Sequence, residues 1–165
     1  MSPAPRLFIR SVGPRDRERM ADLLERMGPE TRYQRFHTPT PQMDPATLAR
    51  LVETDGSSHV TLAAVDPRDG SFAGIAQYAP TGDGQSDVAF AVADDWQRRG
   101  VGTMLALALL RSAAANRRHR LVAMTLGENR AARALLRRLG FAVTRRGGGV
   151  VDYGLDLGGP RALAA

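Results

Sequence analysis

The chain has 165 residues and no cysteine, and its 23 basic residues, all arginine, outnumber its 17 acidic residues. This length predicts one domain with its own apolar core. The lack of cysteine excludes disulfides, thiol-linked acyl intermediates and thiolate metal sites, and the three scattered histidines fall short of a usual catalytic metal set, so we expect no metal. No apolar run approaches the roughly 20 residues of a membrane-spanning helix, and the start lacks signal-peptide features, which predicts a cytoplasmic protein without a membrane partner.

The first third of the chain predicts one strand followed by three helices. Residues 7–12 are rich in apolar side chains and are followed by a Gly-Pro pair, as a strand would be. A helix is predicted over residues 16–27, because its apolar side chains fall on one helical stripe: Met20, Leu23, Leu24 and Met27. A short helical turn should follow at 30–36. Asp44 and Pro45 predict the start of a third helix, with a side-chain cap and a proline in the first position.

The middle of the chain changes to the pattern of strands. Residues 59–65 and 72–79, separated by a turn, predict an antiparallel hairpin. A strand at 86–92 precedes two glycines and a long apolar helix at 103–115. The next strand, at 121–126, should therefore lie parallel to the strand at 86–92 in a β-α-β unit.

A helix at 129–139 and a final hairpin of residues 141–144 and 150–157 complete the prediction. The element order predicts an α+β domain with a mixed, mostly antiparallel sheet and one β-α-β crossover. We expect a single domain over residues 7–157, a flexible N-terminus at 1–6 and a C-terminal tail at 158–165. The order of the elements leaves the monomer and the homodimer open.

The segment from the strand at 86–92 into the following helix predicts an anion site. Gly100 and Gly102 let the main chain approach a ligand closely, and the N–H groups of the first helical turn lack helical partners. The helix dipole together with Arg98 and Arg99 favours a pyrophosphate there. The segment lacks the lysine of a Walker loop and the third glycine of a dinucleotide fingerprint, and an ordinary loop with a glycine-aided helix start stays open as the alternative.

Two motifs add a specific resemblance. Gln97-Arg-Arg-Gly100-Val-Gly102 resembles the Gln/Arg-x-x-Gly-x-Gly/Ala signature of the GNAT superfamily of N-acetyltransferases, and Asn129-Arg-Ala-Ala132-Arg-Ala-Leu135 followed by Leu139-Gly-Phe141 resembles its second signature. The resemblance implies the acyl-CoA N-acyltransferase fold, with helices on both faces of the sheet. It also implies that the strands at 86–92 and 121–126 splay apart to admit the pantetheine arm of CoA.

The resemblance assigns a set of residues to the donor, acetyl-CoA. The main chain at the end of the first strand would bind pantetheine, the glycine turn would hold the pyrophosphate, and the start of the helix at 129–139 would contact the CoA arm. These residues are Val92, Gln97, Arg98, Arg99, Gly100, Val101, Gly102, Thr103, Asn129 and Arg133. From the residues alone, Asn129 is also a candidate helix cap, and both roles stay open.

The candidate catalytic residue is Asp87. Acyl transfer needs a neutral amine, and without cysteine or a serine elbow we expect the amine to attack the thioester directly. The stretch from Ser86 to Gln97 resembles bacterial Pat-type protein lysine acetyltransferases, in which a glutamate at the Asp87 position is the general base; the shorter aspartate predicts a water relay. A solvated carboxylate is the alternative reading. The tyrosine that many GNAT proteins use as general acid is Leu136 here.

The predicted reaction is transfer of an acetyl group from acetyl-CoA to a primary amine, first of all a protein lysine such as that of an acyl-CoA synthetase. A small-molecule amine (antibiotic, polyamine or amino acid) as acceptor, and a catalytically weak CoA-binding module, stay open as alternatives. Residues 94–146 hold twelve arginines against three acids, whereas residues 36–93 hold two arginines against seven acids. This separation suits an anionic donor and a cationic acceptor better than a nucleic acid, which we do not expect as a partner.

Overall fold

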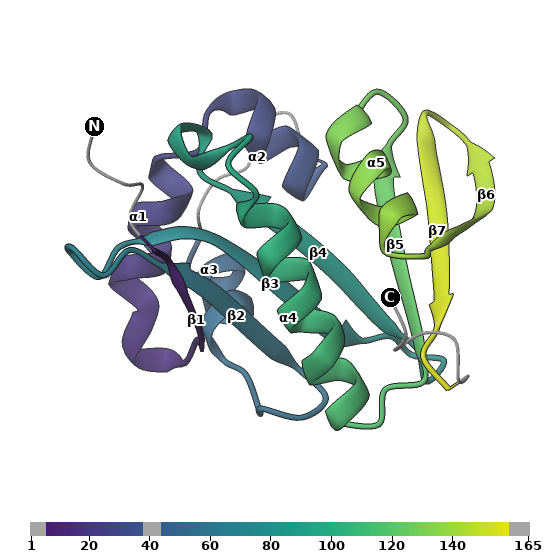
Figure 1. Ribbon diagram of the computed structural model, residues 1–165, viewed down its shortest axis with the longest axis horizontal. Helices are drawn as coiled ribbons and strands as arrows, with labels where there is room; N and C mark the ends of the chain where they lie inside the picture. The colour runs from purple at the N-terminus through teal and green to yellow at the C-terminus, as the bar shows by residue number, and fades with distance from the viewer. Residues whose placement is uncertain (1–5, 38–43, 159–165) are drawn as a thin grey trace.

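The computed structural model contains one seven-stranded sheet in the order β1-β2-β3-β4-β5-β7-β6 (Figure 1). The strands are β1 (Phe8–Ser11), β2 (Val60–Val65), β3 (Phe72–Pro80), β4 (Ser86–Val92), β5 (Arg120–Leu126), β6 (Ala142–Gly147) and β7 (Val150–Asp156). Neighbouring strands are antiparallel except β4 and β5, which are parallel. The mixed, mostly antiparallel sheet predicted from the sequence is thus confirmed.

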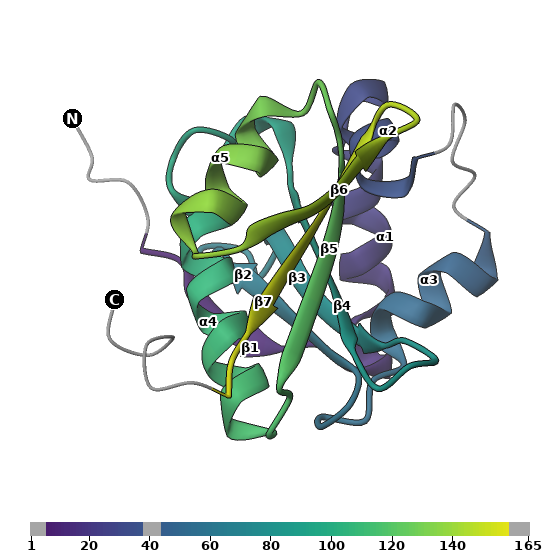
Figure 2. The same cartoon turned by 90° about the vertical axis from the view of Figure 1, so that its right-hand side faces the viewer.

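Helices cover both faces of this sheet. They are α1 (Arg17–Glu25), α2 (Pro29–Phe36), α3 (Pro45–Val52), α4 (Val101–Ala115) and α5 (Arg130–Arg138), with short 3-10 turns η1 (Pro14–Asp16) and η2 (Asp94–Trp96). Figure 2 shows α4 and α5 on one side of the sheet and α1, α2 and α3 on the other. The crossover predicted between the two parallel strands is made by α4, and the expected helices on both faces are confirmed.

The core lies on the two faces of β2 and β3. Every residue of β2 is buried, and so are residues 72–78 of β3, as expected for strands covered by helices on both sides. The predicted apolar stripe faces this core: Met20, Leu23 and Leu24 of α1 are buried, and so is Met27, two residues beyond the end of the helix. On the other face α4 lies close to β3 at Gly74, where an added Cβ would stand 2.8 Å from the carbonyl oxygen of Ala91 and 3.1 Å from Leu105 Cδ1.

Among the predicted boundaries that differ from the structure, two lie at glycine turns. The helix expected from Thr103 begins at Val101, because Gly100 adopts a left-handed conformation (φ 80°) that turns the chain directly into the helix, so Gly102 lies inside its first turn. The last hairpin is tighter than expected: β6 runs to Gly147, and Gly148 and Gly149, both with positive φ, make the turn. The arginines expected in that turn therefore lie on an exposed edge strand.

The structure describes residues 6–37 and 44–158. Most of the expected N-terminal and C-terminal segments, and most of the proline-rich loop that begins at His37, lie outside these ranges. Asp44 caps α3 as predicted, since its Oδ1 accepts a hydrogen bond from the Thr47 N–H at 2.7 Å. Over the described ranges, no helix has the length and apolarity needed to cross a membrane.

Candidate active site

The two parallel strands separate soon after they meet. β4 and β5 pair only at Ser86 with Leu121 and at Asp87 with Val122, although both strands continue for several residues beyond these pairs. The remaining length of each strand faces a gap, while β4 keeps its pairing with β3 and β5 keeps its pairing with β7. The structure thus contains the splay that the resemblance implies, with a row of main-chain groups on each side.

The glycine turn lies at the end of β4 that is open. Arg98 and Gly100 both have positive φ values, 61° and 80°, and α4 starts at once after them without a side-chain cap. The first N–H groups of α4 therefore have no partner from a capping side chain and point out of the helix end. Arg98 and Arg99 are exposed beside them. This turn is the part of the structure that can hold a pyrophosphate, through main-chain donors, the helix dipole and two guanidinium groups.

Gln97 lies in this turn as part of a clasp, which we define as Gly28, Thr31, Asp94 and Gln97. The Asp94 carboxylate accepts hydrogen bonds from the Gly28 N–H at 3.1 Å and from Thr31 Oγ1 at 2.7 Å. Gln97 Nε2 donates to Thr31 Oγ1 at 3.1 Å and to the Val92 carbonyl oxygen at 3.2 Å. The clasp ties the start of α2 to the end of β4. Gln97 thus holds the turn in place through hydrogen bonds to other protein groups, a role that the motif alone did not indicate.

The start of α5 brings Asn129 and Arg133 to the same end of the sheet. Asn129 Oδ1 accepts a hydrogen bond from the Ala132 N–H at 3.1 Å, so it caps the helix, and its amide NH₂ has no partner among the described residues. Arg133 donates to the Gly127 carbonyl oxygen at 2.8 Å and to the Tyr153 hydroxyl at 3.3 Å. Leu136, one turn further along α5, is buried in the core.

Asp87 stands where the gap begins, because it is the last residue of β4 that pairs with β5. Its side chain has access to solvent, yet the protein around the carboxyl removes enough water to raise its pKa. Two cations oppose this effect and lower the pKa: Arg35 of α2, and His37 at the end of that helix. A carboxyl whose pKa is raised by desolvation can accept a proton more readily than an ordinary surface aspartate.

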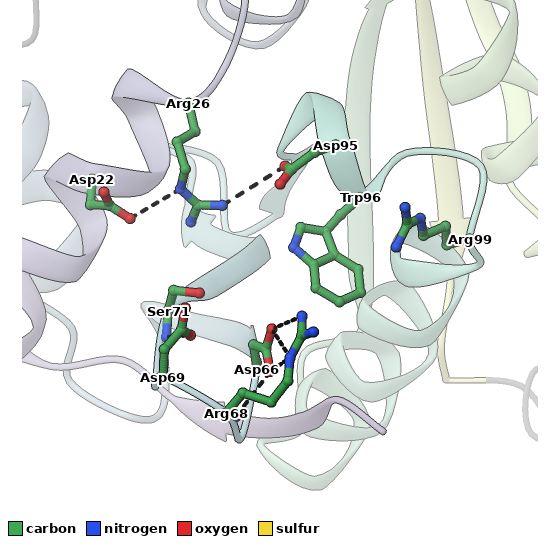
Figure 3. Close-up of a pocket in the computed structure, with 9 residues that line it drawn as sticks. All are labelled: Asp22, Arg26, Asp66, Arg68, Asp69, Ser71, Asp95, Trp96 and Arg99. Atoms are coloured by element: carbon green, nitrogen blue, oxygen red, sulfur yellow. Dashed lines mark hydrogen bonds and ion pairs between the residues drawn. The ribbon is translucent and has the colours of Figure 1, made fainter. Parts of the chain in front are cut away.

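A separate hollow of about 380 Å³ lies between α1, the β2–β3 turn and η2 (Figure 3). Its charged side chains mostly pair with one another: Arg26 with Asp22 (3.0 Å), Arg26 with Asp95 (3.9 Å) and Arg68 with Asp66 (2.6 Å). Arg99 lies over the ring of Trp96, 5.1 Å from its centroid, and Trp96 itself is buried. The lining includes no residue of β4, β5 or α5, so the hollow is distinct from the gap.

Sequence reasoning missed several residues that shape the site. Thr31, Asp94 and Arg35 act through contacts with segments more than 40 positions away, which no local pattern reports. The only local signal for Arg35 was its place in the short helical turn predicted at 30–36. Among the residues that the structure describes, no group of three or more His, Cys, Asp or Glu side chains could hold a metal ion.

The mixed sheet, its splayed parallel pair and the glycine turn that opens a helix beside the splay are the features that the resemblance to GNAT N-acetyltransferases implies. The family description "Acetyltransferase (GNAT) domain" matches residues 6–142. The chain therefore belongs to the GNAT acetyltransferase family, and it is an N-acetyltransferase by family.

Individual relatives agree with this assignment. Acetyltransferase PA5475 of Pseudomonas aeruginosa is 32% identical over 142 residues, which cover 84% of this chain and 76% of the relative. Acetyltransferase Pat of Mycolicibacterium smegmatis is 32% identical over 152 residues, 91% of this chain but only 45% of that protein's length. The crystal structure of the GNAT domain of S. lividans PAT superposes with a TM-score of 0.85 at 27% identity, covering 92% of this chain and 90% of that one.

Proposed function

We propose that the protein transfers an acetyl group from acetyl-CoA to a primary amine, and that the amine is the lysine side chain of a protein such as an acyl-CoA synthetase. The observation that carries the proposal is the place of Asp87 at the start of the gap between β4 and β5, where a donor arm in the gap and an acceptor amine would meet. The similarity to proteins named Pat supports a protein lysine as the acceptor.

Acetyl-CoA supplies an activated thioester carbonyl for attack by the amine. The unpaired N–H groups at the start of α4, with Arg98 and Arg99, bind and orient the pyrophosphate end of the donor. The strand edges that face the gap offer main-chain groups to the pantetheine arm. Asn129 directs its free amide to the same arm, while Val92 contributes main-chain atoms at the end of β4.

Asp87 removes the proton of the attacking amine. A primary amine such as lysine has a reference pKa of about 10.4, so the bound amine must lose a proton before or during attack. The carboxylate of Asp87, one methylene shorter than glutamate, receives this proton through a water molecule. The amine nitrogen bonds to the acetyl carbonyl carbon as the C–S bond breaks, and the departing thiolate takes a proton from solvent, because Leu136 is a buried aliphatic side chain that cannot supply one.

Binding and turnover are tested separately. Acetyl-CoA at 100 times its dissociation constant should stabilise the fold by about 2.7 kcal/mol, whereas NAD should not change the melting temperature. Release of free CoA thiol is then measured with a panel of acceptors that includes an acyl-CoA synthetase, polyamines, amino acids and aminoglycosides. Turnover with small amines alone would refute the protein lysine as acceptor, and binding without any turnover would leave a CoA-binding module.

The role of Asp87 is tested with Asp87→Asn. We expect kcat to fall about 10²–10⁴-fold, as for loss of a general base, while stabilisation by acetyl-CoA is retained. Asp83→Asn, in the exposed turn before β4, is the matched control and should keep full activity. Unchanged turnover in Asp87→Asn would remove Asp87 from the mechanism. Because the sequence has no lysine, acetyl-lysine detected by mass spectrometry must lie on the acceptor protein.

A further inference from the structure

The side chain of Arg35 is partly buried, and its guanidinium group has no carboxylate partner among the described residues. Its Nη2 donates a hydrogen bond to Gln77 Oε1 at 3.3 Å, while its Nε is buried and makes no hydrogen bond. Over residues 6–37 and 44–158, no carboxylate lies within 4.0 Å of its guanidinium group. Burial of an unpaired charge is costly, and arginine cannot avoid the cost by losing its proton. Such an arrangement requires an explanation beyond stability.

The position of this guanidinium is fixed through Gln77 on β3. Gln77 Nε2 lies 2.9 Å from the carbonyl oxygen of Arg50 on α3, 3.1 Å from Thr61 Oγ1 and 2.8 Å from His59 Nε2. These contacts hold the amide in one orientation and leave its Oε1 facing α2. Arg35 is therefore directed to one place on the sheet face rather than moving freely as a surface arginine does.

That place is beside Asp87. In the antiparallel pair of β3 and β4, Gln77 lies opposite Ala89, and Ala79 lies opposite Asp87. Alternation along the strands puts Gln77 and Asp87 on the same face, as diagonal neighbours about 7–8 Å apart at the backbone. Because α2 packs on β4 and Arg35 contacts Gln77, the Arg35 guanidinium lies on the face of the sheet that carries Asp87, and it forms no ion pair with that carboxyl.

We propose that Arg35 is a positioning residue for proton removal, a fixed cation whose field keeps the Asp87 carboxyl ionised in a site that is partly closed to water. The proposal rests on the proposed role of Asp87 as general base. A direct ion pair would occupy the carboxylate oxygens and oppose protonation more strongly. A cation at a short distance stabilises the charge and leaves the oxygens free for the amine or for a relay water.

The charged groups near Asp87 shift the pKa of its carboxyl in the direction that this role requires. Burial raises the pKa of Asp87, and Arg35 and His37 lower it. Burial lowers the pKa of Arg35, the nearby charge of Arg50 on α3 lowers it further, and Asp87 raises it. Arg35 keeps its charge across the working pH range, because arginine is not deprotonated in proteins.

The test is the titration of Asp87 in the full chain. Its carboxyl carbon is followed by ¹³C NMR in the wild type and in Arg35→Met, Arg35→Gln and Arg35→Lys. We expect the midpoint to move to higher pH in the Met and Gln variants and to stay near the wild-type value in Arg35→Lys, which keeps the charge. Two neutral variants are used so that one remains if the other does not fold, and circular dichroism confirms the fold of each.

The acidic limb of the pH profile of kcat/KM should move in the same direction in the neutral variants. Arg32→Met is the matched control on the same helix, because Arg32 donates to the carbonyl oxygens of Leu24 and Glu25 and not to the sheet face. An unchanged titration in both neutral variants, or an equal shift in Arg35→Lys, would overturn the proposal. The NMR titration needs no substrate, so a failure of the proposed function would appear as absent turnover with the Asp87 shift still present.

Discussion

At the scale of single residues, Asp16 joins the first strand to the first helix. Its two carboxylate oxygens accept hydrogen bonds from Arg10 at 2.8 and 2.7 Å, and one of them also accepts the Gly13 N–H at 3.0 Å. Asp16 is buried, and Arg10 also lies over the ring of Phe72, 5.3 Å from its centroid. The hydrogen bonds from Arg10 are the main reason that the pKa of Asp16 is lowered.

This lowered pKa predicts how stability depends on pH. A carboxyl whose pKa is lower in the folded state stabilises the fold above its unfolded pKa of about 3.9, and that contribution is lost as the pH falls through the folded value. Asp16→Asn should therefore lower the free energy of unfolding by about 1–3 kcal/mol at pH 7, and the difference from wild type should shrink below about pH 4. Urea unfolding at several pH values measures both effects.

The control is Asp22→Asn, which breaks the pair with Arg26 on the surface of α1. Exposed pairs of this kind contribute about 0.3–0.5 kcal/mol, so this variant should change stability little at any pH. A constant difference between wild type and Asp16→Asn from pH 7 to pH 3 would contradict the assigned role of the ionised carboxyl.

At the scale of elements, Asn129 at the start of α5 has a capping role and a proposed role in donor binding, and substitutions can separate the two. Asn129 uses its oxygen to cap the helix, and its amide NH₂, which has no partner among the described residues, is the group that we propose for contact with acetyl-CoA. Asn129→Ala should lower the free energy of unfolding by about 1 kcal/mol and raise the KM for acetyl-CoA. Asn129→Asp keeps the capping oxygen but loses the donor, so we expect normal stability with a raised KM. A normal KM in Asn129→Asp would show that the residue is a cap alone.

The elements themselves were largely predictable because their signals are local. The apolar residues Met20, Leu23 and Leu24 recur at helical spacing in α1, and Asp44-Pro45 is a complete helix start, so both helices form where the pattern indicates, although α1 ends at Glu25 and not at Met27. The place of the last hairpin was not predictable in the same way. β7 lies between β5 and β6, and this pairing depends on contacts between distant segments, for which neither strand carries a register signal of its own.

The same distinction applies to the site. The glycine turn and Asp87 were found because they belong to motifs of contiguous residues. The clasp of Gly28, Thr31, Asp94 and Gln97 was not, although a Cβ added at Gly28 would stand 2.5 Å from Asp94 Oδ2 and would displace that carboxylate. In the sequence, a glycine followed by a proline is explained by the start of a helix alone. The structure is needed to show that the Asp94 carboxylate lies against Gly28.

At the scale of the whole molecule, the sheet consists of two parts joined at one short seam. β1 to β4 form one antiparallel part and β5, β7 and β6 form the other, and only the pairs Ser86–Leu121 and Asp87–Val122 connect them. The proposed catalytic carboxyl stands at this seam. Figure 2 shows α5 over the second part and α4 on the same face.

The short seam has a consequence for the exchange of backbone amide hydrogens with solvent. Alternate amides of residues 88–92 and 123–126 face the gap rather than a neighbouring strand, so they should exchange rapidly in the free protein, while the amides of β2 and β3 exchange slowly. Acetyl-CoA should slow exchange in both segments together, and fragment-resolved deuterium uptake measures this. Slow exchange in the free protein would mean that other groups already satisfy these amides. If exchange slows only when acetyl-CoA binds, the donor takes the place of a strand between β4 and β5 and pairs with main-chain groups that the sheet leaves open.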